Sequence, residues 1–121
     1  MKDISIYFSP LARLEEQNTL KIGGAILRHT EAGFPEINKG GLAILYVPEF
    51  RGDLELKGKE TQSESFRSFL YDLFLGSDWN MPLYDLGDIL PGNDLNDTYF
   101  AVAQVVSELV KKKVIPVVIG G

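Results

Sequence analysis

The sequence contains no cysteine, and this absence rules out disulfide bonds and thiolate metal sites. It also lacks an excess of positive charge. Because 12 Lys and Arg stand against 17 Asp and Glu, no basic surface for nucleic acid is expected. No apolar run approaches the roughly 18 residues of a membrane span, and residues 1–10 are too short and too polar for a secretory signal. These absences predict a cytoplasmic protein without nucleic-acid or membrane partners.

Also missing is a complete set of catalytic residues. The sequence has no G-x-S-x-G motif and no cluster of His and Asp at metal-ligand spacing. His29 is the only histidine, which is typical of a surface or packed residue rather than of a ligand. Arg51-Gly52-Asp53 matches an adhesion tripeptide but has no such meaning in a cytoplasmic protein. We therefore assign no catalytic, cofactor-binding or metal-binding residue to this chain.

The sequence does contain short apolar runs that are typical of buried strands. Residues 42–47 and 114–121 are nearly continuous in apolar residues, which indicates strands covered on both faces of a parallel sheet. Residues 81–89 form a weaker strand candidate because Asp85 and Asp88 interrupt the run. The polar stretch 49–60 predicts a long loop, which in a compact domain is usually functional or mobile.

Two helices are predicted between these strands. Thr61 and Glu64 match a capping box, and Gly76 stands where a C′ glycine would end the first helix. The apolar residues expected to face the core from this helix are Phe66, Phe69, Leu70, Leu73 and Phe74. Asp94 or Asp97 is expected to cap the second helix. Its two apolar rows predict burial over a wide face; they comprise Phe100, Ala103, Val106 and Val110, and Val102, Val105 and Leu109.

The order of these elements predicts an α/β fold. Strands that alternate with helices at this spacing indicate crossover connections and a mostly parallel sheet. We expect one domain over residues 1–121, with a βαβαβ core at 41–121 and an arm at 1–40 that packs on the sheet. An unpaired edge strand also predicts that the chain pairs with a second copy, exchanges elements or is poorly stable.

Three charged residues near the predicted sheet have alternative roles. Asp85 and Asp88 point to opposite faces of a regular strand, so they cannot share one ion unless Gly87 breaks the strand. We expect a structural role, with Asp85 held by backbone N–H groups or an arginine and Asp88 beginning the turn. Arg67 is placed to reach Asp72, to reach a carboxylate at the sheet end, or to lie in solvent.

Several of these segments, taken in order, resemble the arginase/ureohydrolase superfamily. Residues 42–48 (L-A-I-L-Y-V-P) resemble its first core strand, and Arg67 stands where its members carry an Arg early in the next helix. Residues 84–89 (Y-D-L-G-D-I) are similar to its D-x-G-D/N-x strand end. Residues 115–121 (I-P-V-V-I-G-G) are similar to the strand that leads into its first metal-binding motif. The resemblance covers roughly residues 40–121.

The resemblance implies a three-layer α/β/α sandwich with a mostly parallel sheet. It implies two manganese ions in the full-length parent, which lower the pKa of a bridging water. It also implies guanidino or formimino substrates, namely arginine, agmatine, guanidinobutyrate or N-formimidoylglutamate. Members that resemble formimidoylglutamase are favoured over true arginases. We also expect a homo-oligomer. The metal ligands of that superfamily lie at or beyond the residue that follows the glycine pair. This chain is therefore expected to be the inactive N-terminal portion of a longer hydrolase.

Two other hypotheses belong to different classes. The chain is alternatively an interaction or regulatory domain that has the arginase-like fold without metals and works through its surface. It is alternatively a Rossmann-type half in which Gly120 and Gly121 open a phosphate-binding turn. A tight turn after a core strand is the favoured interpretation of this glycine pair.

Overall fold

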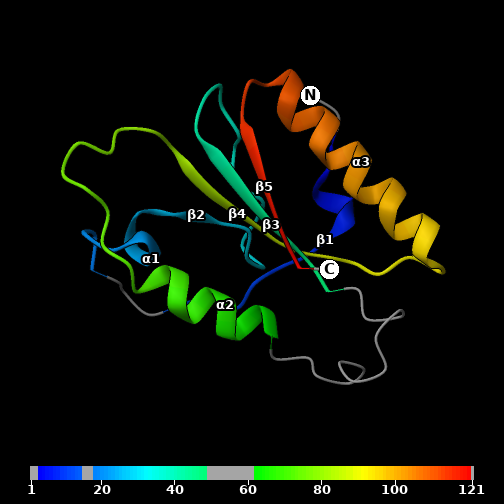
Figure 1. The fold of residues 1–121 in the computed structure, drawn as a ribbon, viewed down its shortest axis with the longest axis horizontal. Coiled ribbons are helices and arrows are strands. Elements are labelled where there is room, and N and C mark those ends of the chain that lie inside the picture. The colour runs from blue at the N-terminus through cyan, green and yellow to red at the C-terminus, as the bar shows by residue number, and fades with distance from the viewer. Residues whose placement is uncertain (1–2, 15–17, 49–61, 121) are drawn as a thin grey trace.

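The centre of the molecule is strand β3 (Leu42–Val47) of a mixed sheet (Figure 1). The computed structural model describes residues 3–14, 18–48 and 62–120 and shows an α/β protein. β3 pairs in parallel with β4 (Leu83–Ile89) on one side and with β5 (Ile115–Gly120) on the other. All three predicted strands are confirmed, and their carboxyl ends lie at the same edge of the sheet.

The first forty residues add two short strands to the other side of β4. β1 (Phe8–Ser9), which follows the 3-10 turn η1 (Ser5–Tyr7), pairs antiparallel with the end of β4. β2 (Leu27–Arg28), which follows α1 (Ile22–Ala25), pairs in parallel with its beginning. The antiparallel β1 makes the sheet mixed, and strands of two residues are too short to leave a periodic signal in the sequence.

Helices lie on both faces of the sheet (Figure 1). α3 (Leu95–Lys111) packs its buried residues against one face, together with Leu45 and Leu86. α2 (Gln62–Tyr71) lies on the opposite face, where Tyr71 packs in a second cluster with Ile44 and Leu83. The β3–β4 and β4–β5 connections cross the sheet in opposite directions, so right-handed crossovers place their helices on opposite faces.

The prediction that β5 is covered on both faces is wrong. Ile115 and Val118 are 56% and 46% exposed. Among the described residues β5 has β3 as its only neighbour in the sheet, which leaves β5 at the edge. β3 has a neighbour on each side and is buried along nearly its whole length, as predicted.

α2 ends at Tyr71 and not before Gly76 as predicted. Backbone bonds to the N-terminal segment replace the next helical turn: the Ile22 N–H donates to the Leu73 carbonyl at 2.8 Å, and the Leu75 N–H donates to the Leu20 carbonyl at 2.9 Å. Thr61 of the predicted capping box lies outside the described residues, and so do the loop at 49–60 and its Arg-Gly-Asp tripeptide.

Asp94 is one of the two residues predicted to cap α3, and it does so. Its Oδ1 accepts a hydrogen bond from the Asp97 N–H at 2.9 Å. The predicted wide apolar face is corrected to a narrower one. Val105 and Leu109 are fully buried, whereas Phe100 and Val110 are each 58% exposed. One apolar row of α3 therefore packs on the sheet, and much of the other faces solvent.

Candidate functional site

The face that α2 turns toward the sheet is largely polar. Its buried residues are Ser63, Arg67 and Tyr71, which recur every fourth position and so lie on one face of the helix. The predicted apolar face is wrong in part. Phe66 and Leu70 pack partly against the sheet, but Phe69, Leu73 and Phe74 are 78%, 55% and 67% exposed.

Arg67 of α2 and Asp85 of β4 form a buried ion pair with two parallel hydrogen bonds. Arg67 Nε donates to Asp85 Oδ2 at 2.8 Å, and Nη2 donates to Oδ1 at 3.0 Å. The third guanidinium nitrogen, Nη1, donates to Asp88 Oδ1 at 2.6 Å. Asp72, the other predicted partner of Arg67, binds Lys21 instead, at 2.6 Å and near the surface. Of the alternatives for Arg67, the structure therefore selects the carboxylates at the sheet end.

A β-bulge at Gly87 brings the two aspartates to the same face of the sheet. The register of β4 against β3 shifts here: Ile44 pairs with Asp85, and the next residue, Leu45, pairs with Gly87. The extra residue reverses the alternation, so Asp88 points to the same side as Asp85. Gly87 has a φ of +103°, and a Cβ there would lie 2.5 Å from the Ser9 carbonyl oxygen. The prediction that Asp88 begins a turn is wrong, because β4 continues through it.

The buried Asp85 carboxylate accepts four hydrogen bonds. Besides the two from Arg67, it accepts one from the Tyr71 hydroxyl and one from the Gly87 N–H at 3.1 Å. An isolated carboxylate without solvent contact would be strongly unfavourable, and these donors replace its hydration shell. Asp85 was expected to be held by backbone N–H groups or by an arginine, and the structure shows both kinds of donor.

Arg28 of β2 extends this cluster, which we define as Arg28, Arg67, Tyr71, Asp85 and Asp88. Arg28 Nε donates to the Tyr71 hydroxyl at 3.0 Å, Nη1 donates to the Ala12 carbonyl at 2.6 Å, and the guanidinium lies 5.2 Å from the Tyr71 ring centre. Two cations and two anions thus join β2, β4 and α2, while the Ala12 bond ties in the N-terminal segment.

Burial and ion pairing set the pKa values within the cluster. Burial raises the pKa of Tyr71, and the adjacent Asp85 charge raises it further. Burial acts to lower the pKa of Arg67, but the hydrogen bonds and charges of Asp85 and Asp88 outweigh it and raise the pKa. Tyr71 therefore stays neutral and Arg67 stays charged near neutral pH.

His29 is a packed residue, which agrees with one of the two expectations for it. It is 8% exposed, and its Nδ1–H donates to the Leu86 carbonyl at 2.9 Å. Its ring packs edge-on against Phe34. Leu86 lies within the bulge of β4, so the histidine binds a carbonyl group at the irregular point of the ladder.

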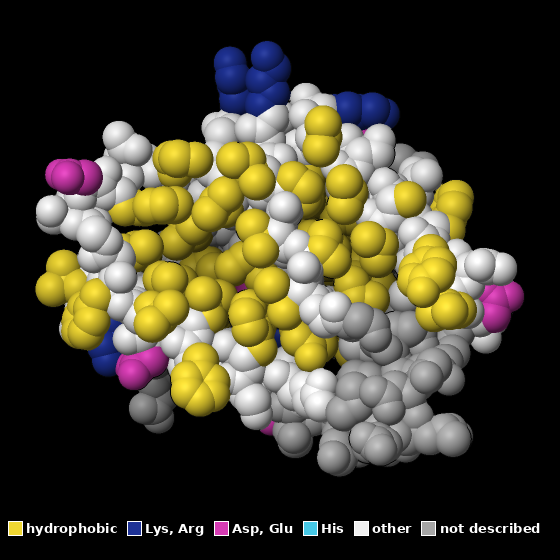
Figure 2. Space-filling view, in the orientation of Figure 1, with side chains coloured by type: hydrophobic (Ala, Val, Ile, Leu, Met, Phe, Trp, Pro, Cys, Tyr) yellow, Lys and Arg dark blue, Asp and Glu magenta, His cyan; other side chains and the backbone are white. Residues whose placement is uncertain are grey.

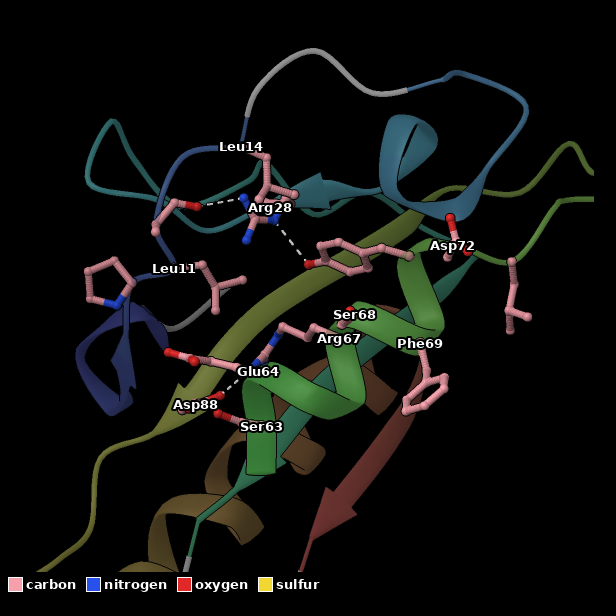
Figure 3. A pocket seen from close by; sticks show the side chains of 14 residues that line it. Leu11, Leu14, Arg28, Ser63, Glu64, Arg67, Ser68, Phe69, Asp72 and Asp88 are labelled. Atoms are coloured by element: carbon pink, nitrogen blue, oxygen red, sulfur yellow. Dashed lines mark hydrogen bonds and ion pairs between the residues drawn. The ribbon is translucent and has the colours of Figure 1, made fainter. Parts of the chain in front are cut away.

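A cavity of about 880 Å³ opens beside the cluster (Figure 3). One part of its wall is polar and carries Arg28, Arg67, Asp88 and Glu64. Another part is apolar, and residues of this kind include Leu11, Leu14 and Phe69. The described residues that line the cavity include no histidine.

The remaining sequence predictions concern metals, membranes and the glycine pair. Within residues 3–14, 18–48 and 62–120, no group of three or more His, Asp or Glu side chains could hold a metal ion. In the same residues no helix has the length and apolar character needed to cross a membrane. Gly120 has a φ of +109° and approaches the Val47 carbonyl closely, while Gly121 lies outside the described residues.

Comparison with known protein families, curated proteins and solved structures found no match for this chain. The geometry alone therefore carries the interpretation of the cluster. The cluster joins α2 to the bulged strand β4 through charged side chains that are nearly all hydrogen-bonded to one another. Such an arrangement holds the helix in a fixed position on the sheet.

Proposed function

We propose that this chain is the N-terminal part of a manganese-dependent hydrolase that acts on guanidino or formimino C–N bonds. In this proposal it builds part of a three-layer α/β/α sandwich with a mostly parallel sheet. The observation that carries the proposal is the arrangement of the resembling segments: β3, β4 and β5 are parallel neighbours whose carboxyl ends share one edge. In open α/β sheets, ligands bind outside that edge.

The described residues do not fit a manganese centre. Asp85 is fully buried beneath Arg67 and Tyr71, and Asp88 binds Arg67. A hard cation needs several oxygen ligands that are free to bind it, and no such group lies among the described residues. In this proposal the metal ligands of the hydrolase come from other residues.

The contribution proposed for this chain is to position the edge of the sheet. Arg67, near the middle of α2, binds the bulged end of β4, and Arg28 connects the neighbouring β2 to the same cluster. A site built at a sheet edge needs its strands fixed to within about 0.5 Å. The cluster supplies this rigidity without contacting substrate.

The test uses the complete protein encoded by the gene that contains this sequence. We expect codons for His and Asp ligands after Gly121, about two manganese ions per chain, and hydrolysis of at least one of the four substrates named above. The chain of residues 1–121 is the control and should show neither stoichiometric manganese binding nor activity. A complete protein without bound metal and without such ligands would refute the proposal.

A second candidate function is an interaction domain without catalysis. The observation in its favour is the number of large apolar side chains on the surface, among them Phe69, Phe74, Phe100 and Val118. Manganese stoichiometry separates the two candidates, because an interaction domain with no metal role should bind none.

A further inference from the structure

The outer edge of β5 is an open pairing surface. In the described part of the chain the sheet ends at β5, with no strand on its outer side. Figure 2 shows a broad apolar surface, with Lys, Arg, Asp and Glu mainly around its margin. Ile115 and Val118 of β5 are exposed, and Val117 and Ile119 are only partly buried.

The backbone of β5 presents hydrogen-bonding groups along this edge. The Ile115 N–H donates to the Gly41 carbonyl, so Ile115 and alternate residues after it face β3. Pro116, Val118 and Gly120 consequently direct their backbone groups outward. Val118 offers an N–H and a carbonyl, Gly120 offers an N–H, and Pro116 offers a carbonyl only, because proline has no N–H.

Protection against pairing is weak at this edge. Natural edge strands usually carry charged side chains, bulges or a covering element. β5 (I-P-V-V-I-G) has no charged residue, and its ladder with β3 runs without a register shift. Pro116 is its one protective residue, and it removes a single donor.

We propose that a second copy of this chain pairs with β5, antiparallel and about a two-fold axis at Val118. This register is self-complementary: each Val118 N–H donates to the other Val118 carbonyl, and each Gly120 N–H donates to the other Pro116 carbonyl. The missing proline donor falls opposite a Gly120 carbonyl, so it weakens only the ends of the ladder. The two sheets then form one continuous sheet.

The charges favour the antiparallel arrangement. Lys111, Lys112 and Lys113 lie where α3 ends and β5 begins, and Asp94 and Asp97 lie at the opposite end of α3. Antiparallel pairing places the basic end of one copy beside the acidic end of the other, whereas parallel pairing would place like charges together. The screening length is about 10 Å at 0.1 M salt, so added salt should weaken this preference.

Sedimentation equilibrium of the 121-residue chain tests the proposal. The wild type should approach twice the monomer mass as its concentration rises. Val118→Lys places two like charges opposite each other at the axis and should give the monomer mass. The matched control is Leu90→Lys. Leu90 follows β4, which β3 separates from β5, and it is 47% exposed against 46% for Val118. It should leave the dimer intact.

Amide hydrogen exchange supplies a second measurement that needs no variant. The Val118 N–H points outward, so it should exchange rapidly in dilute monomer and slowly at concentrations where the dimer forms. A folded monomer at all concentrations would overturn the proposal. A dimer that keeps a rapidly exchanging Val118 amide and tolerates Val118→Lys would overturn it as well, because that dimer uses another surface. Neither result bears on manganese in the complete protein, so the hydrolase proposal stands or fails separately.

Discussion

Replacing the buried Arg67 with methionine should destabilise the protein more than replacing a lysine or arginine at the surface. Methionine keeps the apolar stem of the side chain but removes the charge and its hydrogen bonds. Asp85, which is 0% exposed, would lose two of its four donors and its counter-charge. Asp88 is 25% exposed and would recover hydration in part.

The expected loss follows from the burial of Asp85. Removing one partner of a buried ion pair costs about 3–5 kcal/mol, because the remaining charge is left without compensation. A domain has a free energy of unfolding of about 5–15 kcal/mol in total. The Arg67→Met variant should therefore be close to unfolding at moderate urea concentrations.

Urea unfolding at one fixed protein concentration measures this loss. The control is Lys21→Met, which removes the surface pair with Asp72 and should cost about 1 kcal/mol or less. Adding Asp85→Leu to Arg67→Met should restore about 2 kcal/mol, because no charge is then buried alone. If Arg67→Met and Lys21→Met cost the same, the cluster does not hold α2 on the sheet.

Three further predictions concern the bulge, the helix cap and pH. Gly87→Ala should lower the free energy of unfolding in urea by about 2 kcal/mol or more, because Gly87 has a positive φ and an added Cβ would contact the Ser9 carbonyl. The control is Gly76→Ala, whose Cβ would meet no atom within 4 Å and should change stability little. Equal losses in the two variants would contradict the steric role of Gly87. Asp94→Ala should cost about 1 kcal/mol while Asp94→Asn preserves the cap, and loss of the same stability in both would argue against capping. The pKa of Tyr71 is raised in the folded state. Its contribution to the free energy of unfolding should therefore be fully present below about pH 10 and should decrease as the pH rises above that value. Thermal unfolding measured from neutral to strongly alkaline pH should show a smaller fall in melting temperature for Tyr71→Phe than for the wild type.

The core strands and α3 could be predicted because local sequence determines them. The run Leu42–Val47 is apolar throughout and became the central strand with those bounds. Asp94 and Asp97 ahead of an apolar row both indicate a helix beginning here, and α3 uses Asp94 as its cap. Buried strands and capped helices leave such signals because their apolar residues are contiguous or periodic.

The site could be predicted only in outline, because its decisive partners are distant in the sequence. The inward row of α2 contains Arg67 and Tyr71, and scoring apolar residues alone assigns that row to solvent. Gly87 between two aspartates is the local signal for a bulge, because a regular strand would direct Asp85 and Asp88 to opposite faces. The fact that β4 continues through the bulge depends on pairing with β1 and β3, which no local pattern shows.

The buried carboxylate of Asp85 also has a consequence for folding. If β4 paired with β3 one residue out of step, every side chain of β4 would change sides. Asp85 would then point into the apolar layer that contains Val105 and Leu109, and Leu86 would face Arg67. Such a misaligned intermediate would have to bury an ionised or newly protonated acid in hydrocarbon. Burial of the Asp85 charge therefore disfavours pairing of β4 with β3 in a shifted register.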